Sequence, residues 1–389
     1  MPHRRIASAL LTATLLLAAC GDDDDTSSPP TSDEVSDEQE TEVASGTEDE
    51  TEDDTEAEPE APAPDQPGPY AVGRTTQQVT DPDRPERTLT VEVWYPAAAA
   101  AEPTPYELIP GVAFDADLST VDAPPSEEAP FPVVVFSHGS GGLRQQSASI
   151  VETVASHGFV VVAADHAGNT AIDRLLGTET EFGVSARNRV LDVGLLLDEV
   201  EAGRIAGDLA DAEQVAVMGH SFGGFTALAA AGGFEDIPAD PRVDAIVPLA
   251  PASSRLTDEA LSSISIPMLI VTGSDDATTP VEDQSTRPLG LASGPATLVE
   301  IDGGSHEVVT NICDILTAVS APGAEVPDGT VEAAQSLAGE TCDPGAAVDV
   351  TQAFDITERY AVSFLRQHLA GDERYEAVEP VDGATVRAG

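Results

Sequence analysis

The amino-acid sequence predicts an α/β fold in which a mostly parallel central sheet is flanked by helices. Apolar, strand-like runs alternate with helical segments from about Tyr70 to the end of the chain. Several of these runs are continuously apolar, as in strands that are buried on both faces of a parallel sheet. No internal repeat accompanies the alternation, so one open sheet covered by helices is the expected architecture.

The first predicted elements lie between residues 89 and 165. LTVEVWYP (89–96) alternates apolar and polar residues, which is typical of a half-buried strand. PVVVFSHG (132–139) and FVVVAAD (159–165) are continuous apolar runs, and both predict fully buried strands. Between them, ASIVETVASHG (148–158) has helical spacing and a glycine stop, which predicts a helix that connects the two strands.

Further elements continue the alternation toward the carboxyl terminus. ARNRVLDVGLLLDEVEAG (186–203) predicts a helix, because its apolar residues at 190, 193, 197 and 200 fall on one face. Three more strands and a last helix are expected at VDAIVPLAP (243–251), PMLIVTGSDD (267–276), ATLVEIDGGSH (296–306) and FDITERYAVSFLRQHLAG (354–371). Functional residues are then expected in the loops that follow the carboxyl ends of the strands.

The stretch VAVMGHSFGGFTALAAA (215–231) places Ser221 at a corner between a strand and a helix. The apolar run before the serine predicts a buried strand, and the alanine-rich run after it has high helix propensity. Glycines at 219 and 223 complete a G-x-S-x-G nucleophile elbow, whose strained corner tolerates only small neighbours. Ser221 is therefore the predicted nucleophile, and the backbone N–H of Phe222 is the first predicted donor to an oxyanion.

A serine nucleophile needs a base, and the base needs an acid that orients it. His306 follows a predicted strand and two glycines, and it comes after the serine, as the order Ser–Asp–His requires. His166 also follows a strand but precedes Ser221, so His306 is the preferred base. The loop GSDDATTP offers two candidate acids, Asp275 and Asp276.

A second oxyanion donor is expected in the glycine-rich turn FSHGSGG (136–142), which follows a predicted buried strand. Such a turn can direct a backbone N–H toward the same point as the N–H of Phe222. We predict that Ser140 supplies this N–H, with Gly139 as the alternative. A flexible turn without a functional role is the other interpretation of this stretch.

These motifs resemble those of the platelet-activating-factor acetylhydrolase and dienelactone-hydrolase-like α/β-hydrolases. FSHGSGG, SHGFVVVAADH, GHSFGG, the GSDD and GGSH loops and the WYP of residues 94–96 carry the resemblance, which covers roughly residues 70–310 and the final helix. It implies the α/β-hydrolase fold and a serine esterase that needs no metal or cofactor. The expected substrates are short or oxidised acyl esters, or other small carboxylic esters.

The resemblance also bears on single residues. Related hydrolases have a G-x-x-D-x-x-x-P spacing at the acid loop, and Gly273, Asp276 and Pro280 reproduce it, which favours Asp276 over Asp275. True dienelactone hydrolases typically have a cysteine nucleophile, so the serine here makes lactone hydrolysis a weaker expectation. The segment 313–345 is not part of the resembling motifs, and decoration of an edge is favoured over a flap across the site.

Cysteine usage indicates a protein that acts outside the cytoplasm. Besides Cys20 the chain has only Cys313 and Cys342, which are expected to form a disulfide that closes the 313–345 segment. Two free buried thiols are the alternative. Two thiols without a histidine-rich spacing around them do not indicate a metal site.

The amino-terminal segment predicts export. MPHRRIASALLTATLLLAAC (1–20) has a basic start and a short apolar run, and its ending LAAC resembles a bacterial lipobox in which Cys20 is lipidated. An ordinary signal peptide with a chance cysteine is the alternative. Residues 21–69 are expected to be a disordered acidic linker, since positions 22–65 hold twenty Asp or Glu and no Arg. The catalytic domain is then expected at 70–389, anchored to the outer face of a bacterial membrane.

Charge limits the possible partners. The net charge is −53, and all 17 basic residues are arginines, so nucleic acid is not an expected partner and unassisted binding to anionic lipid is disfavoured. The expected partners are an ester substrate and, through Cys20, a membrane. Nothing in the sequence indicates an oligomeric state.

The sequence thus predicts a serine carboxylic-ester hydrolase that acts on short-chain or oxidised acyl esters. A secreted polyester or cutin-type hydrolase, or a lipase, is the nearest alternative. A surface lipoprotein that keeps the fold and only binds is the alternative from another class. The presence of all three residue types, Ser221, His306 and Asp276, favours an enzyme.

Overall fold

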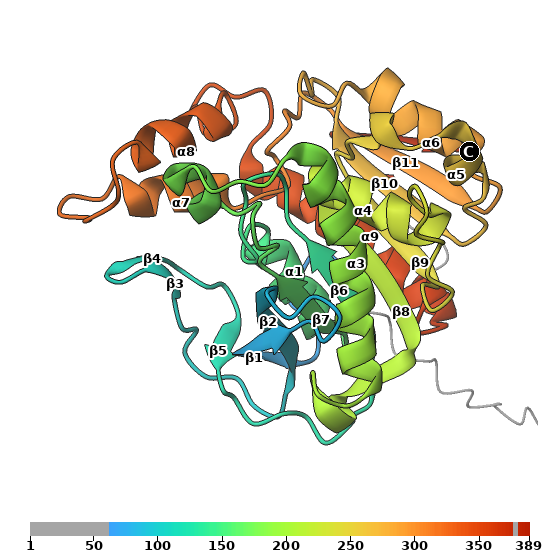
Figure 1. Cartoon of the computed structure of the whole chain (residues 1–389), viewed down its shortest axis with the longest axis horizontal. Helices are drawn as coiled ribbons and strands as arrows, with labels where there is room; N and C mark the ends of the chain where they lie inside the picture. Colours follow the sequence, from blue (N-terminus) through green and yellow to red (C-terminus); the bar gives the residue numbers. More distant parts are fainter. Residues whose placement is uncertain (1–61, 376–379) are drawn as a thin grey trace, which may run out of the picture. The chain divides into compact units, whose positions relative to one another are not determined.

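The computed structural model describes residues 62–375 and 380–389, and in this part of the chain ten strands form one central sheet (Figure 1). Together with a separate pair, the described residues form twelve strands: β1 (Ala71–Thr80), β2 (Thr88–Ala97), β3 (Tyr106–Ile109), β4 (Val112–Phe114), β5 (Ser119–Val121), β6 (Phe131–Ser137), β7 (Val160–Ala164), β8 (Ala210–His220), β9 (Ala245–Leu249), β10 (Met268–Gly273), β11 (Ala296–Ile301) and β12 (Ala384–Ala388). Their order in the sheet is β12-β11-β10-β9-β8-β6-β7-β2-β1-β5, while β3 and β4 form a separate hairpin.

The middle of the sheet is parallel, as predicted. Strands β7, β6, β8, β9, β10 and β11 run in one direction, and antiparallel pairs appear where β2 joins β7, where β1 joins β2 and where β12 joins β11. The carboxyl ends of the six parallel strands therefore lie along one edge, where the loops that follow them meet.

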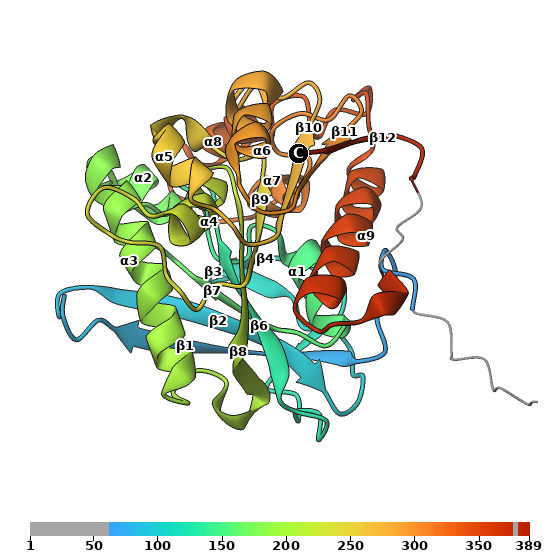
Figure 2. The same cartoon turned by 90° about the vertical axis from the view of Figure 1, so that its right-hand side faces the viewer.

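Helices cover both faces of the sheet (Figure 2). They are α1 (Ala148–Ser156), α2 (Ala171–Leu176), α3 (Phe182–Glu201), α4 (Phe222–Gly232), α5 (Asp258–Ser262), α6 (Arg287–Leu291), α7 (Ile312–Val319), α8 (Thr330–Ala338) and α9 (Val350–His368), with short helical turns η1 (Gly207–Leu209), η2 (Ser253–Arg255), η3 (Glu282–Thr286) and η4 (Glu373–Tyr375). Helices α1 and α9 pack on one face, and α3 and α4 pack on the other.

The two faces carry separate hydrophobic clusters, which explains the continuously apolar strands. In β6, Val133 and Val135 belong to the cluster under α3 and α4, while Val134 and Phe136 belong to the cluster under α1 and α9. Because successive side chains of a strand point to opposite faces, a strand covered on both sides must be apolar at every position. The prediction of fully buried strands at β6 and β7 is confirmed.

The prediction that residues 89–96 form a half-buried strand is wrong in its burial. Glu92, at a position where alternation suggests exposure, is only 2 % exposed. Its carboxylate forms ion pairs with Arg74 at 3.1 Å and Arg144 at 2.9 Å, and Gln145 donates a hydrogen bond to it at 2.6 Å. These partners compensate the buried charge, so a polar residue in the pattern does not mark a solvent-facing side here.

Of the amino-terminal segment for which predictions were made, the structure describes only residues 62–69. The predicted signal segment, Cys20 and the linker up to residue 61 lie outside the described residues. Residues 62–69, expected as the end of the linker, contact the folded unit: Gly68 donates its N–H to the Ser156 hydroxyl, and His157 bonds the carbonyl of Gln66. Contacts with the folded unit thus begin before the expected boundary at residue 70. Within residues 62–375 and 380–389, no helix is both long and apolar enough to cross a membrane.

Candidate active site

Ser221 lies at the corner between β8, which ends at His220, and α4, which begins at Phe222. Its backbone has φ 56° and ψ −110°, a strained conformation for a residue with a side chain. The glycines of the motif allow the corner to pack closely, because a Cβ on Gly223 would lie 1.7 Å from the carbonyl oxygen of Ser137. The local sequence therefore produces the predicted elbow and presents the serine side chain at the end of the strand.

Two hydrogen bonds connect Ser221 to the other predicted residues. The Nε2 atom of His306 lies 2.9 Å from the Ser221 hydroxyl, and its Nδ1 lies 2.7 Å from Oδ2 of Asp276. Asp275 does not take part, since its carboxylate accepts a hydrogen bond from Ser274 instead. The structure thus brings together Ser221, His306 and Asp276 from the loops after β8, β11 and β10.

The Asp276 carboxylate is held in an ionised state. Its Oδ1 accepts the backbone N–H groups of Thr278 at 2.8 Å and Thr279 at 2.7 Å, and its Oδ2 accepts the Thr279 hydroxyl at 2.7 Å. Burial alone raises the pKa of this carboxyl, but the hydrogen bonds and charge interaction with His306 and the bonds from Thr279 lower the pKa below its usual value. An anionic Asp276 orders the imidazole so that Nδ1 carries a proton and Nε2 faces Ser221 as an acceptor.

The hydrogen bonds of the turn after β6 distinguish between Ser140 and Gly139, the two candidates for the second oxyanion donor. The backbone N–H of Gly139 is already engaged, because it donates to Oε1 of Gln146 at 2.7 Å. No hydrogen bond within the described part of the chain engages the N–H of Ser140. Phe222 is the first residue of α4, where backbone N–H groups have no acceptor within the helix. This arrangement favours Ser140 over Gly139.

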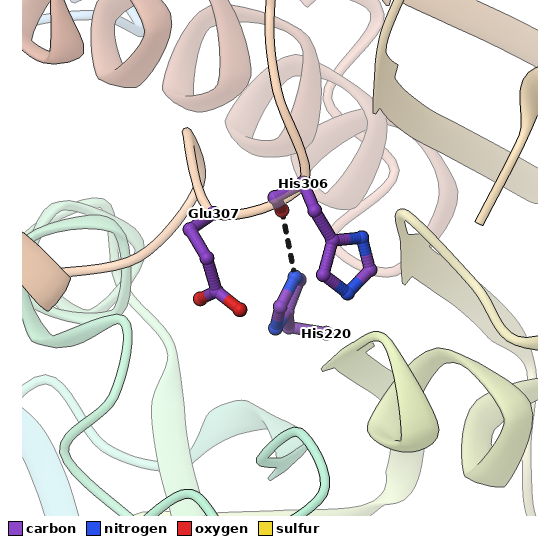
Figure 3. A group of neighbouring side chains, drawn as sticks. All are labelled: His220, His306 and Glu307. Atoms are coloured by element: carbon purple, nitrogen blue, oxygen red, sulfur yellow. Dashed lines mark hydrogen bonds between the residues drawn. The ribbon is translucent and has the colours of Figure 1, made fainter. Parts of the chain in front are cut away.

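His220 lies beside the base and fixes its loop (Figure 3). Its Nε2 donates to the backbone carbonyl of His306 at 3.0 Å, and its Nδ1 accepts from Nε2 of Gln146 at 3.1 Å. Burial lowers the pKa of His220 to about 3, so the ring is neutral. Glu307 completes a group with metal-ligand residue types, but both nitrogens of His220 and of His306 are engaged in hydrogen bonds. The geometry is that of a hydrogen-bonded bridge and not of a metal site.

His166, the alternative base, lies elsewhere. Its ring is buried, with Nε2 at 2.9 Å from the Ser137 hydroxyl and Nδ1 at 2.8 Å from Asp192. Burial lowers the pKa of His166 to about 4, which leaves it neutral inside the protein. The structure does not bring it to Ser221.

Ser221 and His306 open into a pocket of about 680 Å³. One wall is the turn with Ser140, and a second wall comes from α2. A third wall comes from the segment after His306, through Ile312, Ile315, Val319, Pro327, Thr330, Ala333, Ala334, Ser336 and Leu337. The expectation that residues 313–345 only decorate an edge is therefore wrong, because α7 and α8 line the pocket.

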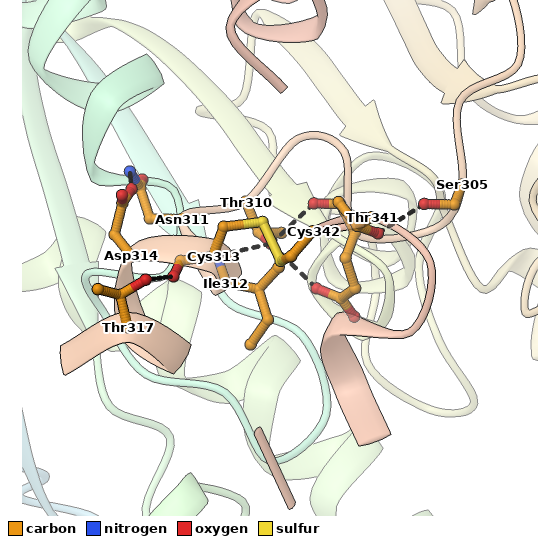
Figure 4. Close-up of a disulfide and its surroundings, with 10 residues drawn as sticks. Ser305, Thr310, Asn311, Ile312, Cys313, Asp314, Thr317, Thr341 and Cys342 are labelled. Atoms are coloured by element: carbon orange, nitrogen blue, oxygen red, sulfur yellow. Dashed lines mark hydrogen bonds between the residues drawn. A yellow bond between two sulfur atoms is a disulfide. The ribbon is translucent and has the colours of Figure 1, made fainter. Parts of the chain in front are cut away.

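A disulfide closes this segment, as predicted. Cys313 and Cys342 are bonded, which joins the start of α7 to the chain after α8 (Figure 4). The neighbouring Thr341 forms a hydrogen bond of 2.6 Å with Ser305, the residue before His306. The pocket wall is thus attached both by a covalent bond and by a contact to the loop that carries the base.

Comparison with known proteins places this arrangement in a family. The profile of the PET hydrolase-like family matches residues 119–320, just over half of the chain. The chain belongs to the PET hydrolase-like family. The matched region includes Ser221, Asp276 and His306.

Individual relatives of this PET hydrolase-like chain are named as a cutinase, an acetylhydrolase and a chlorophyllase. It is 29% identical over 184 residues to cutinase est2 of Thermobifida alba, covering 47% of this chain and 55% of that one. It is 23% identical over 280 residues to platelet-activating factor acetylhydrolase of Bos taurus, covering 61% and 57% of the two chains. It is 30% identical over 142 residues to chlorophyllase type 0 of Chenopodium album, covering 35% and 38%. The chain thus spans about half the length of such relatives or less.

A solved structure confirms the fold of this PET hydrolase-like chain. The ferulic acid esterase from Streptomyces cinnamoneus superimposes with a TM-score of 0.61 at 23% identity, over 82% of this chain and 96% of the other. Together with the mostly parallel sheet, this likeness confirms the predicted α/β-hydrolase fold. The predicted resemblance to the platelet-activating-factor acetylhydrolase group is confirmed as well.

Sequence reasoning missed several residues of this PET hydrolase-like site. Thr279 bonds Asp276, Gln146 joins the Ser140 turn to His220, and Arg189 lies behind that turn. Thr279 could have been found from its place in the acid loop. Gln146 and Arg189 carry no local motif, because their partners are distant in sequence.

Proposed function

We propose that the protein is a serine carboxylic-ester hydrolase that works through an acyl-enzyme. The observation that carries the proposal is the hydrogen-bonded series from Ser221 through His306 to Asp276, in which Ser221 and His306 line a pocket. In this proposal Ser221 is the nucleophile, His306 the general base and acid, and Asp276 the group that orients the imidazole. Likeness to proteins named cutinase and acetylhydrolase supports the same reaction class.

The proposed reaction has two halves. The Ser221 oxygen attacks the ester carbonyl carbon while its proton passes to Nε2 of His306, and the carbonyl oxygen becomes an anion that the N–H groups of Phe222 and Ser140 stabilise. The carbon–oxygen bond to the alcohol then breaks, and His306 returns the proton to the leaving oxygen. In the second half a water molecule attacks the acyl-enzyme by the same route and releases the acid and the free serine.

We propose short-chain or oxidised acyl esters as the substrates. The pocket is mostly apolar in the wall formed by α7 and α8, which suits an acyl chain, and its volume of about 680 Å³ suits a small ester. A polyester or cutin-type substrate is the second candidate. It is supported by the exposed apolar residues Ile172 and Leu337, which are 47 % and 38 % exposed and line the pocket.

We propose further that the catalytic domain, residues 70–389, acts outside the cytoplasm. A disulfide such as Cys313–Cys342 is typical of oxidising compartments, and the basic and apolar start of the chain is typical of an export signal. Lipidation of Cys20 would anchor the protein to a membrane, with residues 21–69 as the tether.

Hydrolysis of p-nitrophenyl esters from acetate to palmitate, with Ser221→Ala as the matched control, tests this function. We expect rapid turnover of the acetate and butyrate esters by the native chain and a loss of about 10⁵-fold or more in the variant, since a serine triad without its nucleophile loses most of its rate. A preference for long acyl chains would favour a lipase. A folded native chain that is inert on every ester would favour the binding protein.

A further inference from the structure

A fully buried arginine lies directly behind the turn that carries Ser140. Arg189 of α3 has 0 % of its surface exposed. Its Nη1 donates to the carbonyl oxygen of His138 at 2.5 Å, and its Nη2 donates to the carbonyl oxygen of Gly139 at 2.9 Å. The planar guanidinium fork thus binds two successive carbonyls of the turn.

One of these carbonyls shares a peptide unit with the proposed oxyanion donor. The carbonyl of Gly139 and the N–H of Ser140 belong to the same planar peptide, and in a trans peptide they point in opposite directions. The carbonyl also accepts a hydrogen bond from Nδ1 of His138 at 2.7 Å, on the same buried side of the turn. Fixing the carbonyl against Arg189 therefore directs the N–H of Ser140 away from the guanidinium, and Ser140 lines the pocket.

The same guanidinium also contacts the residue of the other donor. Its Cζ lies 4.6 Å from the ring centroid of Phe222, and that ring stacks on Phe182 with the centroids 4.5 Å apart. A single buried side chain therefore contacts Phe222 and the Gly139 carbonyl, which shares a peptide unit with the N–H of Ser140.

The charge of Arg189 is not directly paired. Among the described residues its hydrogen-bond acceptors are uncharged: the two carbonyls, the hydroxyl of Ser137 at 3.2 Å and the amide oxygen of Asn169 at 2.7 Å. Burial lowers the pKa of Arg189 to about 9, so it stays cationic at neutral pH; the charge of Asp192 raises this pKa and that of Arg87 lowers it. An unpaired buried cation is costly, and this one lies behind the turn that carries the proposed oxyanion donor.

We propose that Arg189 is a positioning residue for the oxyanion hole, and this inference rests on the proposed function. Its fork holds the carbonyls of His138 and Gly139 so that the N–H of Ser140 faces the tetrahedral intermediate. Its positive charge lies behind the hole and stabilises the anionic intermediate more than the neutral ester.

Three variants test this role. Arg189→Met removes the fork and the charge, and Arg189→Lys keeps the charge but replaces the fork by a single ammonium group. Arg187→Met is the matched control, because Arg187 lies on the same helix, is partly exposed and pairs with Asp236 at the surface. Near-ultraviolet circular dichroism and thermal unfolding establish that each variant is folded.

The expected effect falls on kcat and not on KM. For p-nitrophenyl butyrate we expect kcat of Arg189→Met to fall about 10- to 100-fold with KM changed less than about threefold, since loss of an oxyanion donor acts on the transition state. Arg189→Lys is expected to lose about tenfold, and Arg187→Met to match the native protein.

The inhibition constant of butylboronic acid is a second measurement, and it would not change if Arg189 had only a structural role. The boronate forms a tetrahedral anion on the serine, so its inhibition constant is expected to rise in parallel with the fall in kcat. Full kcat and unchanged boronate affinity in either folded Arg189 variant would overturn the inference. If the native chain hydrolyses no ester at all, the proposed function fails and the inference fails with it.

Discussion

The proposed reactivity of Ser221 depends on contacts between residues that lie far apart in the sequence. His306 lies 85 residues away in the sequence and is brought to 2.9 Å by the sheet, which places the ends of β8 and β11 at one edge. Asp276 is held by three donors from Thr278 and Thr279 besides the imidazole, so the ionised acid is already oriented in the absence of substrate. Orientation of the imidazole is therefore a property of the folded loops.

The two neighbouring aspartates allow a matched test of the acid. We expect Asp276→Asn to lower kcat by about 10⁴-fold, as the loss of the orienting carboxylate does in other serine triads, because the imidazole then takes the wrong tautomer. Asp275→Asn should keep nearly native kcat, since within residues 62–375 and 380–389 its carboxylate bonds Ser274 and not His306. Steady-state kinetics on p-nitrophenyl butyrate compares the two. Equal losses in both variants would contradict the assignment of Asp276.

The site residues differ in how far sequence could predict them. Ser221 and His306 follow from motif and chain order, and Asp276 follows from the spacing of its loop. Gln146 and Arg189 could not be predicted, since their partners lie on other loops and depend on the tertiary fold. The burial of Glu92 could not be predicted either, because the two arginines that compensate its negative charge lie far from it in the sequence.

At the scale of elements, the pair α7 and α8 determines one wall of the pocket. The disulfide joins the two ends of this segment, and Thr341 connects it to Ser305 beside the base. The wall is therefore positioned by a bond that reducing conditions remove.

Replacement of the disulfide tests the contribution of this wall. We expect Cys313→Ser to lower the free energy of unfolding by about 3.6 kcal/mol on the chain-entropy account of a loop of this length. We also expect the ratio of kcat/KM for octanoate over acetate esters to fall, because the apolar wall loses its fixed position. Glu332→Gln, an exposed change on α8, is the control. An unchanged acyl-chain profile in the folded Cys313→Ser variant would show that the wall does not select substrates.

Helix α9 carries a buried carboxyl that makes stability depend on pH. Burial, with smaller contributions from Asp355, Asp117 and Asp65, raises the pKa of Glu358 to about 8 despite a hydrogen bond with Thr153. Because the folded state holds this proton more tightly than the unfolded state does, the stabilisation is complete below about pH 4.5 and is lost as the pH rises toward 8.

Glu358→Gln isolates this effect. Relative to the variant, the native protein should lose on the order of a few kcal/mol of unfolding free energy between about pH 4.5 and 8, with no further change above. Urea unfolding at several pH values measures the difference. Parallel pH profiles for the two proteins would contradict the assigned pKa.

For the whole molecule, the alternation of strands and helices predicts the parallel centre of the sheet and the neighbouring strand β2, but not the edge strands β1, β5 and β12. Elements in the segments 101–130, 167–185 and 313–345 were not predicted, and these include the β3–β4 hairpin, α2, α7 and α8. Their short apolar stretches show neither helical nor strand-like spacing of apolar residues. Their positions depend on tertiary contacts with the folded sheet. The substrate pocket is formed largely by such segments, so its shape was the least predictable feature.

The most direct test of the central claim is the identification of the residue that reacts with a fluorophosphonate. The probe forms a covalent phosphonyl adduct with an activated serine, and mass spectrometry of the digested protein locates it. We predict a single adduct on Ser221, absent in Ser221→Ala and strongly slowed in His306→Gln. A folded protein that forms no adduct, or that carries it on another serine, would contradict the account.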